Sequence, residues 1–166
     1  MNKKEFVYYC KNTKALLIGD VMLDRYVLGK VNRVSPEAPV PVFLANEKKQ
    51  VLGGAGNVFN NLISMNVFTT FITIVGNDIN GKQIKNKLKG IKNCKIYLLN
   101  EAKKISTTKT RYLVNGQQLI RVDEEDKLEL SKKNYDAILK NFKKELKKHD
   151  IVILSDYNKG IFNKNL

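Results

Sequence analysis

Four short runs of mainly apolar residues constrain the fold of this 166-residue chain more than any other feature. They span residues 15–18, 68–75, 95–99 and 151–154, and glycine or small polar residues close each of them. Contiguous apolar runs of this length are typical of strands that are buried on both faces of a parallel sheet. Segments with helical spacing lie between them. The sequence therefore predicts an α/β fold with a parallel core sheet and flanking helices.

Three segments have the apolar spacing of core helices, at residues 57–66, 79–89 and 131–148. Asp78 is placed to cap the second helix, which has Ile84 and Leu88 on its buried side. Residues 2–12 fit either a short helix or a loose segment, and their pattern does not decide between the two. The third helix is expected to bury one face, made of Tyr135, Ile138, Leu139, Phe142 and Leu146.

Two further segments break the alternation of strands and helices. Residues 25–51 contain three prolines, which exclude a helix interior, and their apolar residues suit extended strands. Residues 105–123 are rich in threonine and aliphatic residues and contain Asn115-Gly116, the strongest short hairpin signal in the chain. We expect both segments to lie side by side in one small β-sheet, separate from the core.

A glycine-rich stretch, Gly53-Gly54-Ala55-Gly56-Asn57, joins the first of these segments to a helix. Glycine lets the backbone turn sharply and approach a ligand without an intervening Cβ. The helix N-terminus adds unpaired N–H groups, and Asn57 can both donate to and accept from a sugar hydroxyl. The stretch is neither a P-loop nor a dinucleotide fingerprint. A strand-to-helix turn without a ligand remains an equal alternative on these residues alone.

Two carboxylates follow the first apolar run, and ligands of open α/β sheets bind beyond the carboxyl ends of such strands. Asp20 and Asp24 are therefore expected near a site, with Asp20 read as the cap of a turn. His149 is the only histidine and lies at the end of a predicted helix, where a cation is favourable, so we assign it no catalytic role.

The formal charge of +14 raises the question of nucleic-acid binding. Only four of the 30 basic residues are arginine, and the lysines are scattered over the whole chain. This distribution favours a solvated surface, and no specific nucleic-acid partner is predicted. No apolar run is long enough for a membrane span, and no secretion signal is recognised. Cys10 and Cys94 lack metal-ligand spacing, so we expect reduced thiols and a cytoplasmic location.

Six motifs, in the same order along the chain, resemble those of the PfkB (ribokinase-like) carbohydrate kinases. The resemblance is strongest to the D-glycero-β-D-manno-heptose-7-phosphate kinases, which include the kinase half of the bifunctional ADP-heptose synthesis protein. All four arginines fall within the motifs. They are Gly19–Tyr26, Arg33–Val42, Gly53–Val58, Thr108–Arg111, Gln117–Asp123 and Leu154–Gly160.

The resemblance implies a ribokinase-like (Rossmann-type) core with a small β-lid, formed by segments of about 25–51 and 105–123. It covers residues 14–166 and leaves 1–13 as an N-terminal extension. Members of the family transfer the γ-phosphoryl group of ATP to a sugar hydroxyl with Mg²⁺, and they dimerise through the lid. For the heptose branch the acceptor is O1 of D-glycero-D-manno-heptose 7-phosphate, in the synthesis of ADP-heptose for the lipopolysaccharide core.

The resemblance also implies roles for individual residues. Asp24 accepts hydrogen bonds from sugar hydroxyls, and Lys109 and Arg111 on the lid hold the remote phosphate. The full set implied to bind substrate is Asp24, Gly53, Gly54, Asn57, Lys109, Arg111, Gln118 and Arg121. A second group at the carboxyl end of the fourth strand is a candidate phosphate-transfer region, namely Ser155, Asp156 and Lys159. Turn chemistry is the alternative for these three.

One family hallmark, a Gly-Ala-Gly-Asp motif whose aspartate is the general base, has no counterpart in these residues. The chain thus resembles the front part of such a kinase, with an incomplete core sheet and no catalytic residue or metal ligand assigned. We expect it to bind no ATP or Mg²⁺ by itself and to be inactive alone. The alternatives are a kinase for another sugar or sugar phosphate, and a non-catalytic sugar-phosphate-binding or assembly module.

Overall fold

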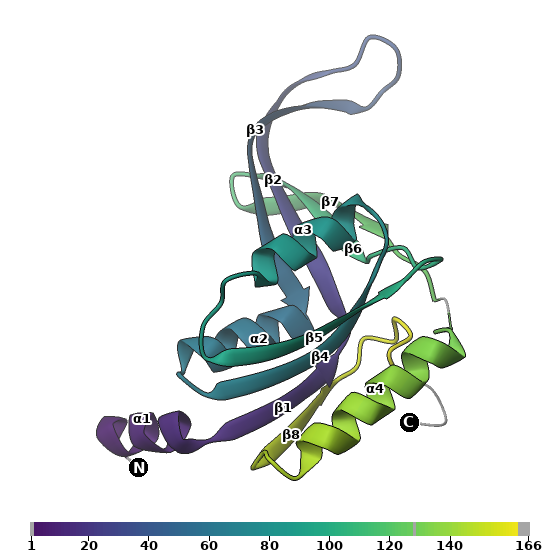
Figure 1. Ribbon diagram of the computed structural model, residues 1–166. Coiled ribbons are helices and arrows are strands. Elements are labelled where there is room, and N and C mark those ends of the chain that lie inside the picture. Colours follow the sequence, from purple (N-terminus) through teal and green to yellow (C-terminus); the bar gives the residue numbers. More distant parts are fainter. Residues whose placement is uncertain (1, 128, 163–166) are drawn as a thin grey trace.

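A computed structural model describes residues 2–127 and 129–162 and shows two four-stranded β-sheets that meet at one end (Figure 1). The core sheet is parallel throughout, in the order β5-β4-β1-β8. Its strands are β1 (Lys14–Gly19), β4 (Phe68–Gly76), β5 (Cys94–Glu101) and β8 (Ile151–Ser155). The four apolar runs thus form the predicted parallel sheet, and the α/β class is confirmed.

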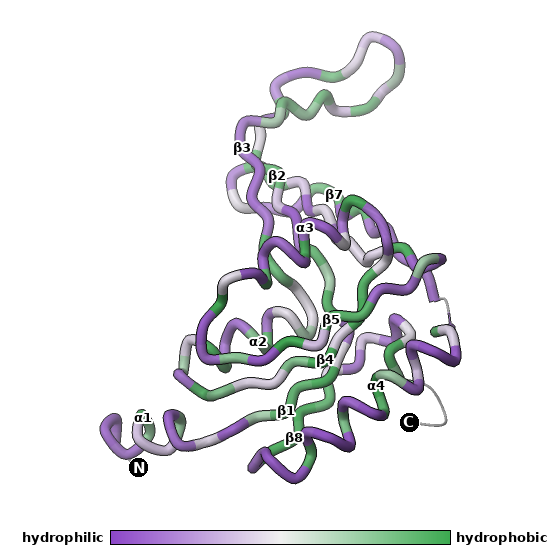
Figure 2. The backbone as a smooth tube through the Cα atoms, viewed as in Figure 1, coloured by the Kyte–Doolittle hydropathy of each residue, from purple (hydrophilic) through white to green (hydrophobic). Residues whose placement is uncertain are grey.

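Helices cover both faces of the core sheet, so its strands carry apolar side chains on both sides. Because side chains alternate along a strand, Leu17 of β1 packs on one face with Phe59, while Leu16 packs on the other with Ile138. Figure 2 shows the resulting apolar band along the core strands. The helices are α1 (Lys3–Asn12), α2 (Ala55–Ser64), α3 (Ile79–Leu88) and α4 (Lys132–Leu146).

Two helix starts have clear capping interactions, of which the sequence predicts the one at Asp78. Asp78 caps α3, because its Oδ1 accepts a hydrogen bond of 2.6 Å from the Gly81 N–H. The open question about residues 2–12 is answered by a helix, α1, in which Asn2 and Glu5 form a reciprocal capping box. No helix within the described ranges is long and apolar enough to cross a bilayer.

The second sheet is the lid, and it combines the two segments that interrupt the core pattern. Its order is β3-β2-β6-β7, with β2 and β6 parallel and the outer pairs antiparallel. Asn115 and Gly116 both have positive φ, as a tight hairpin turn requires. The strands are β2 (Val21–Val34), β3 (Pro41–Gly54), β6 (Thr108–Val114) and β7 (Gln117–Glu124), and all but β6 extend beyond the predicted segments 25–51 and 105–123.

Two burial predictions are wrong. β8 was expected to be buried, but Ile151, Val152 and Leu154 are 42%, 42% and 63% exposed. Among the described strands β8 pairs only with β1, so it lies at the edge of the sheet. In α4, Leu146 is exposed and Glu145 is buried instead, because position 145 continues the inward stripe of Ile138 at helical spacing.

Glu145 links α4 to β5 and makes acid stability testable. Its carboxylate accepts hydrogen bonds from Lys95 Nζ (2.8 Å) and Tyr97 Oη (2.7 Å). The Lys95 hydrogen bond is the main reason that the pKa of Glu145 falls from 4.5 to about 2. Ionised Glu145 therefore stabilises the fold above pH 4.5, and this contribution is lost as the pH falls toward 2.

Glu145→Gln is expected to lower the free energy of unfolding at pH 7 by about 1–3 kcal/mol. It should also flatten the pH dependence of stability between about pH 4.5 and 2. Urea melts across this range measure both effects. Glu47→Gln is the control, since Glu47 is exposed and, among the residues that the structure describes, forms an ion pair only with Lys49 on the same strand. A variant whose pH profile matches the wild type would contradict the assigned role of Glu145.

Candidate substrate site between core and lid

The candidate site lies where the lid joins the carboxyl ends of the core strands. A single residue, Asp20, separates β1 from β2, so the chain passes directly from the core into the lid. The carboxyl end of β8 is adjacent, because Gly19 is in register with Ser155. The N-terminus of α2 follows β3 at the same place, and the Ala55 N–H donates to the Asp20 carbonyl at 3.0 Å. Several elements therefore bring polar groups to this junction.

The lid sheet has two faces with different chemistry. Residues in cross-strand register share a face, so Asp24, Lys109 and Asp123 lie together, as do Arg111 and Arg121. We call this the Asp24 face. The other side carries alternate residues of the same strands, and we call it the Arg25 face. The Arg25 face contains Arg25, Val27, Thr110, Tyr112, Val122 and Glu124.

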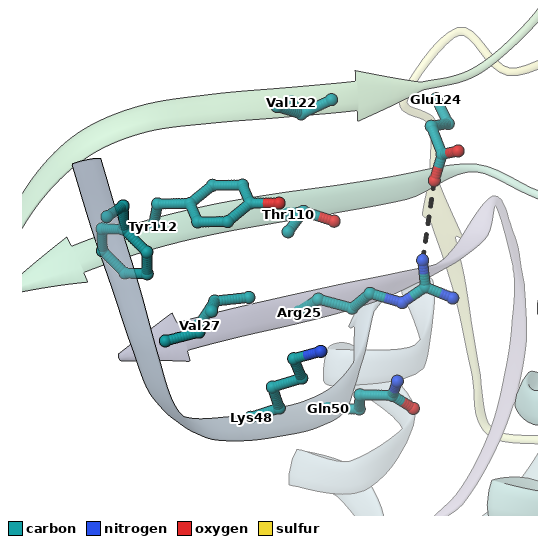
Figure 3. A pocket seen from close by; sticks show the side chains of 10 residues that line it. Arg25, Val27, Lys48, Gln50, Thr110, Tyr112, Val122 and Glu124 are labelled. Carbon is teal, nitrogen blue, oxygen red and sulfur yellow. Dashed lines mark ion pairs between the residues drawn. The ribbon is translucent and has the colours of Figure 1, made fainter. Parts of the chain in front are cut away.

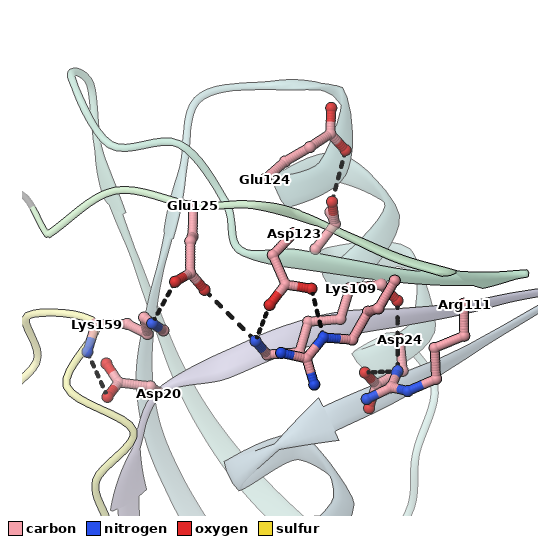
Figure 4. Close-up of polar contacts among 10 residues, drawn as sticks. Asp20, Asp24, Lys109, Arg111, Asp123, Glu124, Glu125 and Lys159 are labelled. Atoms are coloured by element: carbon pink, nitrogen blue, oxygen red, sulfur yellow. Dashed lines mark hydrogen bonds and ion pairs between the residues drawn. The ribbon is translucent and has the colours of Figure 1, made fainter. Parts of the chain in front are cut away.

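An ion pair between Asp24 and Arg111 dominates the Asp24 face (Figure 4). Asp24 Oδ1 lies 2.6 Å from Arg111 Nη1, and both side chains are mostly removed from solvent. This hydrogen bond from Arg111 to Asp24 raises the pKa of the guanidinium. The Arg111 guanidinium also lies 5.4 Å from the ring centre of Tyr26. The pair presents an acceptor for hydroxyl groups beside a cation for an anionic group.

The two glycines of the predicted substrate set are required by close packing at this point. A Cβ on Gly53 would lie 2.2 Å from Asp24 Oδ2. Gly54 has φ of +56° and leads into α2, and a Cβ there would lie 2.5 Å from the Asp20 carbonyl oxygen. Asn57 is exposed on the first turn of α2. The glycines thus let β3 approach Asp24 closely, and Asn57 remains accessible to a ligand.

A second cluster on the Asp24 face pairs each lysine with a carboxylate. Lys109 Nζ lies 2.8 Å from Asp123 and 3.5 Å from Glu125, and Lys159 Nζ lies 2.8 Å from Glu125. Arg121 Nε lies 2.9 Å from Asp123. The hydrogen bond from Lys109 lowers the pKa of Asp123, and that from Lys159 lowers the pKa of Glu125. Both carboxylates are therefore ionised at neutral pH.

Asp20 is buried behind this cluster and caps the loop that follows β8, in line with its predicted capping role. Its carboxylate accepts hydrogen bonds from the backbone N–H groups of Tyr157 (3.0 Å), Lys159 (3.1 Å) and Ile161 (3.2 Å). Burial raises the pKa of Asp20, although these N–H donors and Lys104 oppose that effect. The capped loop fixes the backbone from which Lys159 reaches toward the lid.

Three predicted residues do not join these clusters. Ser155 ends β8, and its carbonyl accepts from the Asp20 N–H at 3.1 Å. Asp156 Oδ1 accepts from the Asn158 N–H at 2.7 Å, which is the turn chemistry weighed as the alternative for it. Gln118 is exposed and pairs with Leu113 near the hairpin turn, further along the lid than Asp24. His149 contacts Thr70 Oγ1 and the Glu145 carbonyl, both at 2.8 Å, at the end of α4.

The sequence interpretation missed Arg25, Glu124 and Glu125. The Arg25 guanidinium reaches Asn80 and Gln83 of α3 and lies 3.6 Å from Glu124, so it ties the lid to a core helix. Figure 3 shows Arg25 and Glu124 on the wall of a cavity of about 640 Å³ on the Arg25 face. Four consecutive carboxylates, at 123–126, span the end of β7 and the residues after it, and β7 pairs with a strand that carries Lys109 and Arg111. This run was the available signal.

Within the described residues, no three aspartate, glutamate, histidine or cysteine side chains converge as metal ligands. Carboxylate oxygens are the ligands that Mg²⁺ prefers in proteins, and here most of them are paired with lysine or arginine. These residues therefore do not fit a dedicated Mg²⁺ site, and no chemical step is assigned to a metal here.

Comparison with known proteins agrees with this architecture. The chain is 41% identical over 153 residues to bifunctional protein HldE of a Nitratiruptor species, covering 92% of this chain and 33% of that protein. It is 41% identical over 150 residues to bifunctional protein HldE of Helicobacter pylori, covering 90% and 32%. The chain thus spans about a third of the length of the curated relatives it matches.

The fold is also found among solved structures. Phosphofructokinase-2 from Escherichia coli in complex with fructose-6-phosphate aligns over 86% of this chain and 45% of its own, with a TM-score of 0.61 and 15% identity. The model of the pfkB family carbohydrate kinases matches residues 12–166, which include both sheets and every predicted site residue. With a parallel core, a four-stranded lid and this match over nearly its whole length, the chain belongs to the pfkB family of carbohydrate kinases.

Proposed function

We propose that this chain is the sugar-binding part of a kinase that phosphorylates O1 of D-glycero-D-manno-heptose 7-phosphate, in the synthesis of ADP-heptose in the cytoplasm. The observation that carries the proposal is the Asp24 face, where an acceptor for hydroxyls and cations for a phosphate adjoin the same glycine-rich turn. The 41% identity to two proteins named HldE supports the heptose branch. A kinase for another sugar phosphate is the second candidate.

The proposed roles follow from charge and position. Asp24 accepts hydrogen bonds from sugar hydroxyls, and Gly53 leaves room for the carboxylate beside the backbone. Arg111 and Lys109 bind the remote phosphate, Arg111 through its planar fork and Lys109 as a point charge. Asn57 contributes an amide at the start of α2. Gln118 and Arg121 are assigned a weaker role at the outer margin of the same face.

Phosphoryl transfer needs a nucleotide, charge neutralisation by Mg²⁺ and a base for the hydroxyl. We propose that groups outside these 166 residues supply all three, because the chain has no Gly-Ala-Gly-Asp motif and its described carboxylates form no metal cluster. We therefore expect the isolated chain to bind the sugar phosphate without turning it over. Lys159 and its neighbours at the end of β8 are assigned to the side of the site nearer the transferred phosphoryl group.

Isothermal titration of the chain with heptose 7-phosphate tests the proposal. We expect binding that is weakened at least tenfold when the phosphate is removed from the ligand, because a charge-assisted contact contributes about 1.5–3 kcal/mol. Fructose 6-phosphate and ribose 5-phosphate are the comparison ligands. Tighter binding of either would favour the second candidate. No saturable binding of any sugar phosphate would contradict the sugar-binding role itself.

We further propose that the lid mediates a homodimer through its Arg25 face. An apolar groove of about 480 Å³ lies on this face, and Leu119 and Ile120 beside it are 50% and 56% exposed. Exposed strand edges and apolar sheet faces are usually covered, and a two-fold copy of the same surface is the commonest cover. The groove is lined by Pro41, Phe43, Tyr112, Leu119, Ile120 and Val122.

Ile120→Glu is expected to convert the dimer to a monomer at micromolar concentration, because the added charge would have to be buried in the interface. Size-exclusion chromatography with light scattering measures the change. Ile79→Glu is the matched control, since Ile79 is 73% exposed and lies on α3 rather than on the lid. A wild-type chain that is monomeric, or a dimer that survives Ile120→Glu, would contradict a lid interface.

A further inference from the structure

Glu125 lies between two lysines that come from different parts of the molecule (Figure 4). Its Oε1 is 2.8 Å from Lys159 Nζ, and its Oε2 is 3.5 Å from Lys109 Nζ. Lys109 belongs to the lid strand β6, and Lys159 belongs to the loop that follows core strand β8. A single carboxylate thus joins the lid to the core at the edge of the candidate site.

The side chain of Lys109 and the backbone of Lys159 are held by contacts that do not involve Glu125. The backbone N–H of Lys159 donates to buried Asp20 at 3.1 Å, and Lys109 Nζ also contacts Asp123 at 2.8 Å. Their side chains are only 12% and 17% exposed, so solvent alone screens the two ammonium groups poorly. An anion placed between the two ammonium groups is therefore stabilised, and this anion can be the Glu125 carboxylate or one from a ligand.

A phosphate monoester could take the same position. It carries up to two negative charges and three acceptor oxygens, which allows it to bridge two ammonium groups as the Glu125 carboxylate does. Lys109 is already assigned to the phosphate of the sugar substrate, so this step rests on the proposed function. Lys159 is assigned above to the side nearer the transferred phosphoryl group, but it contacts the same carboxylate as Lys109, so the two sides adjoin at this point. The shared carboxylate shows that the two lysines can serve one anion.

We propose that Glu125 is an internal counter-ion that occupies an anion site shared by Lys109 and Lys159, and that a phosphate monoester displaces it. The phosphate then replaces the carboxylate as the link between lid and core. No covalent bond changes in this exchange. The hydrogen bond from Lys159 keeps the pKa of Glu125 below its usual value, so the carboxylate is ionised and competes at neutral pH.

Glu125→Gln tests the exchange, because it keeps the size of the side chain and removes the competing charge. Inorganic phosphate is titrated into the full chain at pH 7.5 and constant ionic strength, followed by ¹H–¹⁵N NMR. We expect the dissociation constant to fall about two- to tenfold, the range given by one or two partly exposed ion pairs. Glu47→Gln removes an exposed carboxylate from β3 and should leave the constant unchanged. Lys159→Gln should weaken phosphate binding in both backgrounds.

Unchanged or weaker phosphate binding in Glu125→Gln would overturn the proposal, because Glu125 would then position the lysines rather than compete for them. Glu125→Asp is the second variant, since its carboxylate is one methylene shorter and should compete less well for the two lysines, giving an intermediate dissociation constant. Parallel titrations with heptose 7-phosphate and with ATP identify the source of the phosphate by which affinity the variant increases. If heptose 7-phosphate binds the wild type no better than inorganic phosphate, the proposed function fails. The exchange at Glu125 is still tested by the inorganic phosphate titrations of the Glu125 variants.

Discussion

Asp24→Ala is expected to weaken heptose 7-phosphate binding by about 10- to 100-fold, because hydrogen bonds to a charged acceptor contribute about 1.5–3 kcal/mol. The variant removes the proposed acceptor for the sugar hydroxyls and also deprives Arg111 of its partner at 2.6 Å. The loss should therefore fall on the sugar more than on the phosphate. Isothermal titration with heptose 7-phosphate and with inorganic phosphate separates the two contributions.

Measuring both ligands distinguishes the loss of a sugar contact from a general loss of structure in this variant. Inorganic phosphate should bind Asp24→Ala at least as tightly as the wild type, since Lys109 keeps its contact with Asp123 and Arg111 loses a competing carboxylate. Asp136→Asn serves as the charge control, because Asp136 is exposed on α4, away from the lid. Equal heptose phosphate affinity in wild type and Asp24→Ala would place the sugar elsewhere.

Asp20→Ala is expected to have the largest effect on stability, a loss of at least about 3 kcal/mol in the free energy of unfolding. The substitution leaves three backbone N–H groups, of Tyr157, Lys159 and Ile161, without their acceptor. The Ile161 donor is buried and the other two are partly buried. An orphaned buried donor costs about 1–3 kcal/mol, and a domain has only about 5–15 kcal/mol to lose. Urea denaturation monitored by circular dichroism measures the loss.

Asp20→Asn provides the graded comparison. Its amide oxygen can still accept from part of the loop, and the variant removes the ionisation that burial disfavours. Its stability should therefore lie between those of the wild type and Asp20→Ala.

Asp20 also makes the stability of the wild type depend on pH in a predictable direction. Since burial raises the folded-state pKa of Asp20 above 3.8, stability from this group is greatest below that pH and falls as the pH rises through the folded-state pKa. A fully stable Asp20→Ala would show that the loop does not depend on the carboxylate.

The fold could be predicted from the sequence where local patterns determine the structure. The apolar run of β1 and the positive-φ pair Asn115-Gly116 specify a buried strand and a tight hairpin with little help from the rest of the chain. The exposure of β8 could not be predicted, because an apolar run has the same pattern at the edge of a sheet as at its centre. The burial of Leu146 was predicted wrongly for a related reason. Adjacent Glu145 occupies the buried position because Lys95 on β5 lies opposite and pairs with its carboxylate, which the local sequence does not show.

The candidate site was predictable in its parts but not in its connections. Asp24 and Arg111 were each placed by motif, yet their 87-residue separation hides the ion pair that joins them. Glu125 gave no separate signal, because an acidic turn is ordinarily solvated. Its role depends on Lys159, which comes from the loop after β8. Ion pairs of this kind can be recognised only once the relative positions of β2, β6 and the loop after β8 are known.

The parallel pairing of β2 with β6 has a consequence for the order in which the chain folds. Each lid hairpin is local, but the pairing that joins them aligns Leu23 with Thr108, far apart in the sequence. Bringing such distant segments together has an entropic cost that only the intervening core elements, α2 to β5, can offset. The complete lid should therefore assemble after the core has formed, and the substrate site should be among the last parts of the chain to fold.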